Sequence, residues 1–552
     1  MISVPGARER LNSYLKSRKG QNFVALLFIL FFLFFNAMSV QGKDWTYDEP
    51  RHYRYGVNIL NGDSTRFDDS KMPVSAWNAL PARVADFLPA GLLKTYLKKL
   101  ITARLMTTLF SMAVAFMVFH WSRELYGWVP ALFSLGLYIL DPNIIAHSQL
   151  VTTDIYVTGM VLLSSYWLWK FANSRRWQDG LWFAVMLGLA QLTKYTAFSL
   201  YGLFAIALLV YDWPSLKKGF ETGRWQEIRH SIWQYAKYTI VVVAISIVII
   251  NAGFLFNRTF MSFGDYSFRS DLFKSVQSKI SFVVPVPYPF LEGLDWIIQK
   301  EKTNTGFGYI YLLGETRFGQ GFPGYYIIAS LLKVPIAIQV ILLAAVAVYL
   351  VDGERRGRFF RNEWFLLWLV LFYTIYFNFF YRAQIGIRFY LIVFPLLYVF
   401  AGVLFMKRYS ITWRQKGALV VLGLYLISSV ISYYPNYISY FNEIVWDRKM
   451  AYKYLADSNL DWGQDAFILK GYRAEHPGVH KAPETPVLLT ETTRYYLDVN
   501  QLVGVTRDPE TYKWLRDNFE PVDMIAPSYL LFEITPKNMR DLCRRTTYCD
   551  QE

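Results

Sequence analysis

Cysteine is almost absent from this sequence of 552 residues, and several other common features are missing. The two cysteines, Cys543 and Cys549, lie close together near the C-terminus. Two thiols do not make a metal site, although they are near enough for a disulfide in an oxidising compartment. There is also no internal repeat, no low-complexity tract and no nucleotide-binding fingerprint. These absences argue against a repeat architecture and a soluble nucleotide-binding domain.

Apolar residues are abundant, because 54% of the chain is hydrophobic and 18% is aromatic. That is far more apolar surface than one soluble core needs, so the chain is predicted to be a mainly α, polytopic membrane protein. Eleven candidate spans are present. They cover residues 22–40, 100–120, 128–141, 154–172, 180–194, 196–211, 237–256, 324–351, 363–380, 388–406 and 417–434.

Charge predicts the orientation of these spans. Basic residues, among them Arg8, Arg10 and Lys16, precede the first span and indicate a cytoplasmic N-terminus, residues 1–21. Lys407 and Arg408 fall in another loop assigned to the cytoplasm, whereas the external connection 142–153 has neither Lys nor Arg. The formal net charge of +15 is explained by these loops and by anionic lipid, so no nucleic-acid partner is expected.

The predicted organisation is a membrane domain, 22–434, followed by an external C-terminal domain, 435–552. Residues 41–99 and 257–322 form the other long external segments. The first has apolar residues at helical spacing and is predicted to form helices at the membrane interface. The C-terminal domain is predicted to be a small α/β module, with a helix after Asp461 and strands at 486–490 and 522–526.

The segment Trp45-Thr-Tyr-Asp48-Glu49-Pro-Arg-His52 follows the first span directly. Two adjacent carboxylates with basic and aromatic neighbours at a membrane face suit chemistry on a charged, lipid-linked substrate. Composition alone would equally describe a solvated loop with a turn at Pro50.

The order of several short motifs resembles a known family. These are the acidic pair after the first span, Thr152-Thr-Asp154 after the third and Thr193-Lys-Tyr195 between the fifth and sixth. Together they resemble the protein O-mannosyltransferase and aminoarabinose-transferase group of GT-C fold enzymes over residues 20–430. Tyr454 to Asp465 also resembles a segment of uncharacterised bacterial members. The resemblance implies transfer of a monosaccharide from a polyprenyl phosphate, undecaprenyl or dolichyl, to a hydroxyl on the external face.

The resemblance also implies a general base, because a hydroxyl is a poor nucleophile that must lose its proton. It assigns Asp48 as this base and Glu49 as a positioning or acceptor-binding group. Asp154 is the second acidic candidate. Its other explanation is structural, since Asp in the first turn of a helix, after a Thr cap, interacts favourably with the helix dipole.

Cations at the external ends of spans are candidates for binding the lipid phosphate. Lys333 lies deep in the eighth span, where a cation is costly unless it is paired or faces water. For Arg104, Arg382 and Arg388, snorkelling to the interface is an equally simple explanation. The predicted phosphate-binding set is Arg104, Lys194, Lys333, Arg382 and Arg388.

Contacts to sugar or acceptor are predicted for Tyr47, His52 and Glu315, the last in a Gly- and Pro-rich loop expected to form turns and a lid. No cofactor is implied with certainty. Some relatives bind a divalent ion, but His147 and Asp154 are only weak candidates, because one histidine with scattered carboxylates does not establish a metal site.

The segment from Asp457 to Asp465 does not fit a calcium-binding EF-hand, which needs glycine at its sixth position, here Trp462. A turn that caps a helix through Asn459 or Asp461 is expected, with interdomain docking as the alternative.

The expected partners are a polyprenyl-phosphate sugar, membrane lipids and a protein, glycan or glycolipid acceptor. The expected location is the bacterial inner membrane, with the active site facing the periplasm. An oligosaccharyltransferase and a non-enzymatic transporter are the competing hypotheses. The Trp-Trp-Asp motif of oligosaccharyltransferases is missing from this sequence. A transporter predicts two repeated halves, and the sequence has no internal repeat.

Overall fold

The computed structural model describes residues 17–63, 71–303, 307–406 and 412–549. Arg8, Arg10, Lys16, Lys407 and Arg408, whose charges contribute to the predicted orientation, lie outside the described residues, as does most of the predicted cytoplasmic N-terminus.

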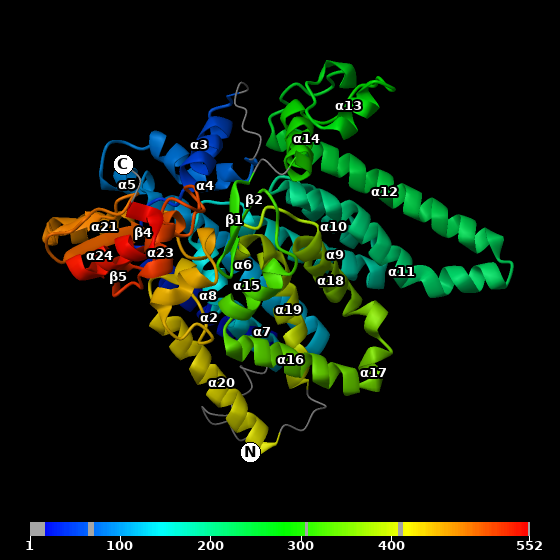
Figure 1. Cartoon of the computed structure of the whole chain (residues 1–552). Helices are drawn as coiled ribbons and strands as arrows, with labels where there is room; N and C mark the ends of the chain where they lie inside the picture. The colour runs from blue at the N-terminus through cyan, green and yellow to red at the C-terminus, as the bar shows by residue number, and fades with distance from the viewer. Residues whose placement is uncertain (1–16, 64–70, 304–306, 407–411, 550–552) are drawn as a thin grey trace.

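Apolar helices are the main elements of the bundle (Figure 1). They are α2 (Arg18–Ser39), α6 (Leu100–Tyr126), α7 (Trp128–Ile139), α9 (Asp154–Ser174), α10 (Trp177–Ala190), α11 (Leu200–Glu221), α12 (Trp225–Gly253), α16 (Ile336–Val351), α18 (Trp364–Phe379), α19 (Phe394–Ala401) and α20 (Trp413–Ser432). The helix α19 lies between two 3-10 turns, η4 (Ile387–Val393) and η5 (Gly402–Phe405). This confirms the prediction of a mainly α protein.

Fewer helices than the predicted eleven are long and apolar enough to cross a membrane. Among the described residues there are six, or up to eight if each of two bent pairs is one span. All eleven predicted spans coincide with helices, but α10 and α18 have only 14 and 16 residues. The helix α9 has 21 residues, several of them polar, such as Thr158, Ser164 and Ser165.

The two bent pairs break at prolines. The helix α7 meets α8 (Pro142–Ser148) at 65°, and α15 (Tyr325–Lys333) meets α16 at 115°. Pro142 starts α8, where its missing N–H costs nothing, and Pro335 separates α15 from α16, since proline cannot continue a helix. The eighth predicted span, residues 324–351, is therefore two helices with a sharp bend between them.

The first external segment forms α3 (Glu49–Leu60), α4 (Ser75–Asp86) and α5 (Leu92–Leu97), as predicted. The helices α3 and α4 pack closely at Gly56, where a Cβ atom would lie 2.2 Å from the carbonyl oxygen of Ser75. Large apolar side chains remain exposed beyond α4, with Phe87 at 77% and Leu92 at 92%. Their contact with the membrane interface remains a prediction.

The second segment contains α13 (Asp271–Gln277), α14 (Tyr288–Thr303) and a hairpin of β1 (Tyr309–Leu312) and β2 (Glu315–Phe318). Leu313 and Gly314 form the turn of this hairpin, both with positive φ. The glycines and prolines do produce turns, as expected.

The C-terminal region is a small α/β module, as predicted. Its sheet has the order β3-β4-β6-β5, with β3 (Val479–Lys481) parallel to β4 (Thr493–Asp498) and the other pairs antiparallel. The strand predicted at 522–526 matches β5 (Asp523–Ala526), which pairs with β6 (Tyr529–Ile534). The strand predicted at 486–490 is wrong, since that segment has no regular structure and its apolar side chains are largely exposed.

Four helices accompany the sheet: α21 (Ala466–Glu475), α22 (Val499–Leu502), α23 (Lys513–Asn518) and α24 (Pro536–Arg545). Cys543 and Cys549 form a disulfide near the end of the chain. The module lies on the side of the molecule away from the α11–α12 hairpin (Figure 1), and its core is continuous with that of the bundle. Residues of the bundle and of the module therefore lie side by side where the two are in contact.

Candidate active site

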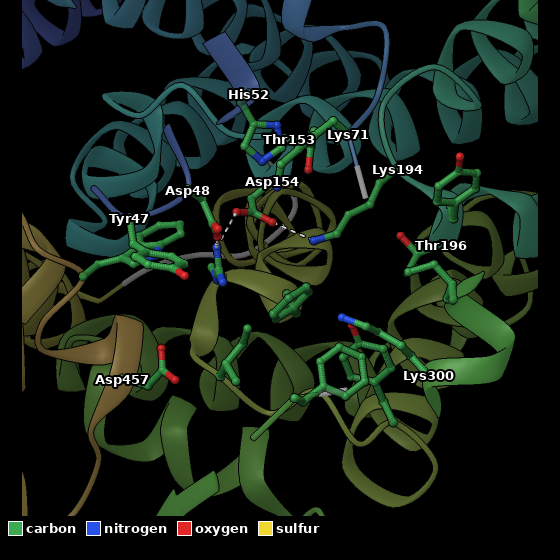
Figure 2. Close-up of a pocket in the computed structure, with 18 of the residues that line it drawn as sticks. Tyr47, Asp48, His52, Lys71, Thr153, Asp154, Lys194, Thr196, Lys300 and Asp457 are labelled. Atoms are coloured by element: carbon green, nitrogen blue, oxygen red, sulfur yellow. Dashed lines mark hydrogen bonds and ion pairs between the residues drawn. The ribbon is translucent and has the colours of Figure 1, made fainter. Parts of the chain in front are cut away.

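A cavity of about 1320 Å³ lies where the helical bundle, the external segments and the C-terminal module meet. Its polar lining includes acidic and basic side chains from distant parts of the chain, which face one another in Figure 2. Its apolar lining is largely aromatic. The apolar residues include Phe198, Leu294, Ile297, Phe372, Tyr373, Tyr376 and Phe389.

Four charged residues form a continuous chain of ion pairs in this cavity, which we call the cavity network. An Arg388 guanidinium nitrogen lies 2.9 Å from Asp48 Oδ2 and 4.0 Å from Asp154 Oδ2. Lys194 Nζ donates to Asp154 Oδ1 at 2.7 Å. The network alternates two carboxylates with two cations. It therefore offers cations to an added anion and carboxylates to a released proton.

Local structure explains how the members of the network are aimed. Asp48 immediately precedes α3, and Asp154 is the first residue of α9, where its charge interacts favourably with the helix dipole. Lys194 lies in the turn after α10, and Arg388 in η4. Thr153 stands at the cap position of α9, but its hydroxyl does not cap the helix, which corrects that part of the prediction.

The charges around Asp48 decide its protonation. Burial alone would raise the pKa of this carboxyl, but the charges of Arg388 and Lys71 outweigh burial and hold the pKa below its usual value. Asp48 is therefore a carboxylate at neutral pH. Burial, followed by repulsion from Lys71, lowers the pKa of His52 to about 3, so His52 is neutral and acts only through hydrogen bonds.

Tyr47 and His52, predicted as sugar or acceptor contacts, both line the cavity. Several lining residues were missed by sequence reasoning, among them Lys71, Lys300 and Asp457 (Figure 2). Lys300 comes from α14 and Asp457 from the segment after α20, more than 150 residues further along. No local pattern marks these residues, because only the fold brings their segments to one cavity.

Glu49 is completely buried beside the cavity and does not line it. Its Oε1 and Oε2 accept from Arg104 Nε and Nη2 at 2.9 and 2.6 Å. The backbone N–H groups of Thr46 and Val151 donate to the same carboxylate. Glu49 thus ties the first external segment to the bundle, which fits the predicted positioning role and not acceptor binding. Arg104 is engaged in this pair and does not line the cavity, although it was among the residues predicted to bind phosphate.

Lys333 is also buried outside the cavity. Its ammonium donates to the backbone carbonyls of Ile438 and Asn459 and lies over the ring of Phe441. The deep cation is therefore satisfied by backbone oxygens that join α15 to the C-terminal region, which corrects its prediction as a phosphate ligand.

Three further predicted residues also lie outside the cavity lining. Arg382 donates to the Glu301 backbone carbonyl, so it links the segment after α18 to the end of α14. Glu315 is exposed and pairs with Arg317 at 2.7 Å. His147 is buried against the ring of Trp462. The described residues contain no group of three or more metal-ligating side chains, and Asp154 is engaged by Lys194, so these residues offer no built metal site.

The family model described as dolichyl-phosphate-mannose-protein mannosyltransferase matches residues 84–251. We call residues 84–251, which are similar to this family, the mannosyltransferase-family domain. The expected resemblance is thereby confirmed over this segment. The mannosyltransferase-family domain runs from the end of α4 to α12 and supplies Asp154 and Lys194, whereas Asp48 and Arg388 lie outside it.

Solved structures give a weaker and longer match. ArnT from Cupriavidus metallidurans, bound to undecaprenyl phosphate, aligns with 75% of this chain and 64% of its own at 14% identity, with a TM-score of 0.44. The Archaeoglobus fulgidus oligosaccharyltransferase, tethered to an acceptor peptide, aligns with 82% and 61% at 11% identity, with a TM-score of 0.47. This chain covers less than two thirds of each of those proteins. No curated protein matches it.

Proposed function

We propose that this protein is a membrane glycosyltransferase that moves a monosaccharide from a polyprenyl phosphate to an acceptor hydroxyl. The observation that carries the proposal is the cavity network, in which two carboxylates and two cations meet in one large cavity with an aromatic lining. The mannosyltransferase-family domain, which provides half of that network, supports the same reaction class.

Donor binding uses the cations and the aromatic lining. Lys194 and Arg388 bind the phosphate, since charge-assisted hydrogen bonds from ammonium and guanidinium groups suit phosphate oxygens. The first isoprene units of the carrier pack on the aromatic side chains, among them Phe389, whose ring lies 3.8 Å from Lys194 Nζ. The polar and apolar parts of the donor are thereby matched by adjacent parts of one cavity.

Asp48 is the general base. Its low pKa keeps it ionised, so it accepts the proton of the acceptor hydroxyl as that oxygen bonds to the anomeric carbon. The bond between the anomeric carbon and the phosphate oxygen breaks in the same step. Lys194 and Arg388 stabilise the charge that develops on the departing polyprenyl phosphate. A single displacement of this kind inverts the anomeric configuration.

The active cavity faces the exterior, which in a bacterium is the periplasmic side of the inner membrane. The charge bias of the loops supports this orientation. The Cys543–Cys549 disulfide supports it as well, because disulfides persist in oxidising compartments. The carrier is undecaprenyl or dolichyl phosphate, and the acceptor is a protein, an envelope glycan or a glycolipid.

The deciding experiment uses purified full-length protein with a panel of polyprenyl-phosphate monosaccharides, and membrane extract as acceptor. Transfer by the wild type from one donor, with loss in Asp48→Asn, is the expected result and names that donor. Retained transfer in Asp48→Asn would assign the base elsewhere, with Asp154→Asn the next variant. Absence of wild-type transfer from every donor would overturn the proposal.

A further inference from the structure

Trp462, in the segment between α20 and α21, contacts Arg388 and the residue that precedes Asp48. Its ring lies over the Arg388 guanidinium, 3.9 Å from the central carbon. Its backbone carbonyl accepts from the N–H of Tyr47, the residue before Asp48, at 2.9 Å. One residue thus contacts the cation through its side chain and the carboxylate-bearing segment through its backbone.

We propose that Trp462 is a positioning residue that sets the distance and orientation between Asp48 and Arg388. The inference deepens the proposed glycosyl transfer and rests on it. It assigns a role to a segment that lies more than 200 residues beyond the mannosyltransferase-family domain. The segment that carries Trp462 would then have to dock on the bundle for Asp48 to be aligned as the base.

The state of Arg388 supports this role. The guanidinium donates to Asp48, but its buried Nε has no hydrogen-bond partner among the described residues. Only 7% of Arg388 is exposed, and the Trp462 ring covers the guanidinium. Stacking on the Trp462 face therefore fixes the plane of the group in addition to its one strong hydrogen bond.

The backbone that carries the ring is held by hydrogen bonds. The backbone N–H of Trp462 donates to Gln464 Oε1 at 2.7 Å, and the backbone N–H of Gly463 donates to Asp461 Oδ1 at 2.8 Å. Gly463 has φ of +88°, which lets the chain turn beside Trp45 and Tyr47. The predicted helix cap by Asn459 or Asp461 is wrong, because α21 begins only at Ala466 and these side chains bond elsewhere.

Asn459 adds a backbone constraint on the other side. Its Oδ1 accepts from the N–H of Ile387 at 3.0 Å, and its Nδ2 donates to the Tyr325 hydroxyl at 2.9 Å. The residue immediately before Arg388 is therefore fixed by the same segment that carries Trp462. As the alternative prediction has it, the segment from Asp457 to Asp465 docks on the bundle, and it contacts the cavity network there.

The test compares Trp462→Leu, which removes the stacking face, with Trp462→Phe, which keeps a ring. Trp446→Leu is the matched control, since Trp446 is 90% exposed and lies outside the cavity lining. Each full-length variant is purified, and its transfer rate is measured against donor concentration and pH. The donor is the one that the wild type uses.

We expect Trp462→Leu to lower kcat by at least about tenfold, Trp462→Phe to recover most of it and Trp446→Leu to match the wild type. The acid limb of the pH profile should move to higher pH in Trp462→Leu. This shift follows if Arg388 moves away, because Arg388 lowers the pKa of Asp48. The other charged or titratable groups near Asp48 are Lys71, His52, Lys194 and Asp457, and Asp154 shares Arg388 with Asp48.

Unchanged kcat and an unchanged acid limb in Trp462→Leu would overturn the inference while leaving the proposed function intact. Equal losses in Trp462→Leu and Trp462→Phe, with no movement of the acid limb, would also overturn it and reduce Trp462 to a packing residue. Failure of the wild type to transfer from any donor would overturn the proposed function, and this inference with it.

Discussion

The cavity network and the Glu49–Arg104 pair lie next to each other, because Asp48 and Glu49 are adjacent in the chain, yet their surroundings differ. Asp48 and Arg388 line a large cavity and pair there at 2.9 Å. Glu49 is sealed in protein and receives two backbone donors in addition to Arg104. A buried ion pair whose oxygens are all engaged holds segments together, whereas an ion pair on a cavity wall can exchange partners with a substrate.

The largest expected effect separates the two carboxylates by activity. Asp48→Asn should lower kcat by about 10²- to 10⁴-fold, the usual contribution of a general base, while the melting temperature changes little. Steady-state transfer assays and thermal unfolding of the purified protein check this. Comparable transfer by Asp48→Asn and the wild type would remove the distinction between cavity carboxylate and structural carboxylate.

Glu49→Gln should act on stability. It leaves the buried Arg104 charge without its partner, so we expect the free energy of unfolding to fall by about 3–5 kcal/mol. Thermal unfolding in detergent measures the loss.

The double variant Glu49→Gln/Arg104→Met should regain much of that stability, since it removes the unpaired charge as well. A double variant no more stable than Glu49→Gln would mean that the backbone donors to Glu49, and not the ion pair, hold the first external segment.

Lys194→Met keeps the length of the side chain but removes its charge. Because Lys194 is proposed to bind the donor phosphate, its loss should raise KM for the donor by about tenfold or more, equivalent to about 1.5–3 kcal/mol. Donor-titration kinetics measure this. Lys333→Met is the contrasting variant, since Lys333 is buried away from the cavity, and its effect should appear in stability instead.

The smallest effect concerns Asp457, a cavity-wall carboxyl from the C-terminal side. Burial raises its pKa to about 6, against the opposing attraction of Arg388. Its contribution to stability is thus fully present below about pH 4 and is lost as the pH rises through 6. Asp457→Asn should therefore weaken the pH dependence of stability across this range.

Melting temperatures measured between pH 4 and pH 7.5 test the prediction for Asp457. Asp447→Asn serves as the control, because Asp447 is more exposed and lies outside the cavity lining. Identical pH dependence in Asp457→Asn and the wild type would show that Asp457 does not titrate in this range.

Sequence reasoning predicted the membrane helices well, because each is a long apolar run whose period and flanking charges are local properties. It also identified Asp48, Asp154, Lys194 and Arg388, which the structure brings together. It could not tell that Asp48 lines the cavity and Glu49 does not. Nor could it tell that the cavity cations do so and that Arg104 and Lys333 do not. Those distinctions depend on partners between 55 and 340 residues away.

The sequence by itself determined the helical membrane architecture, the α/β character of the C-terminal module and the types of chemistry at hand, since hydropathy, turn residues and side-chain acidity are carried by the residues themselves. Only the tertiary structure decided which charges share a cavity and which are sealed in pairs. It also decided that Trp462 stacks on Arg388, because that contact joins segments that meet only when the module docks on the bundle.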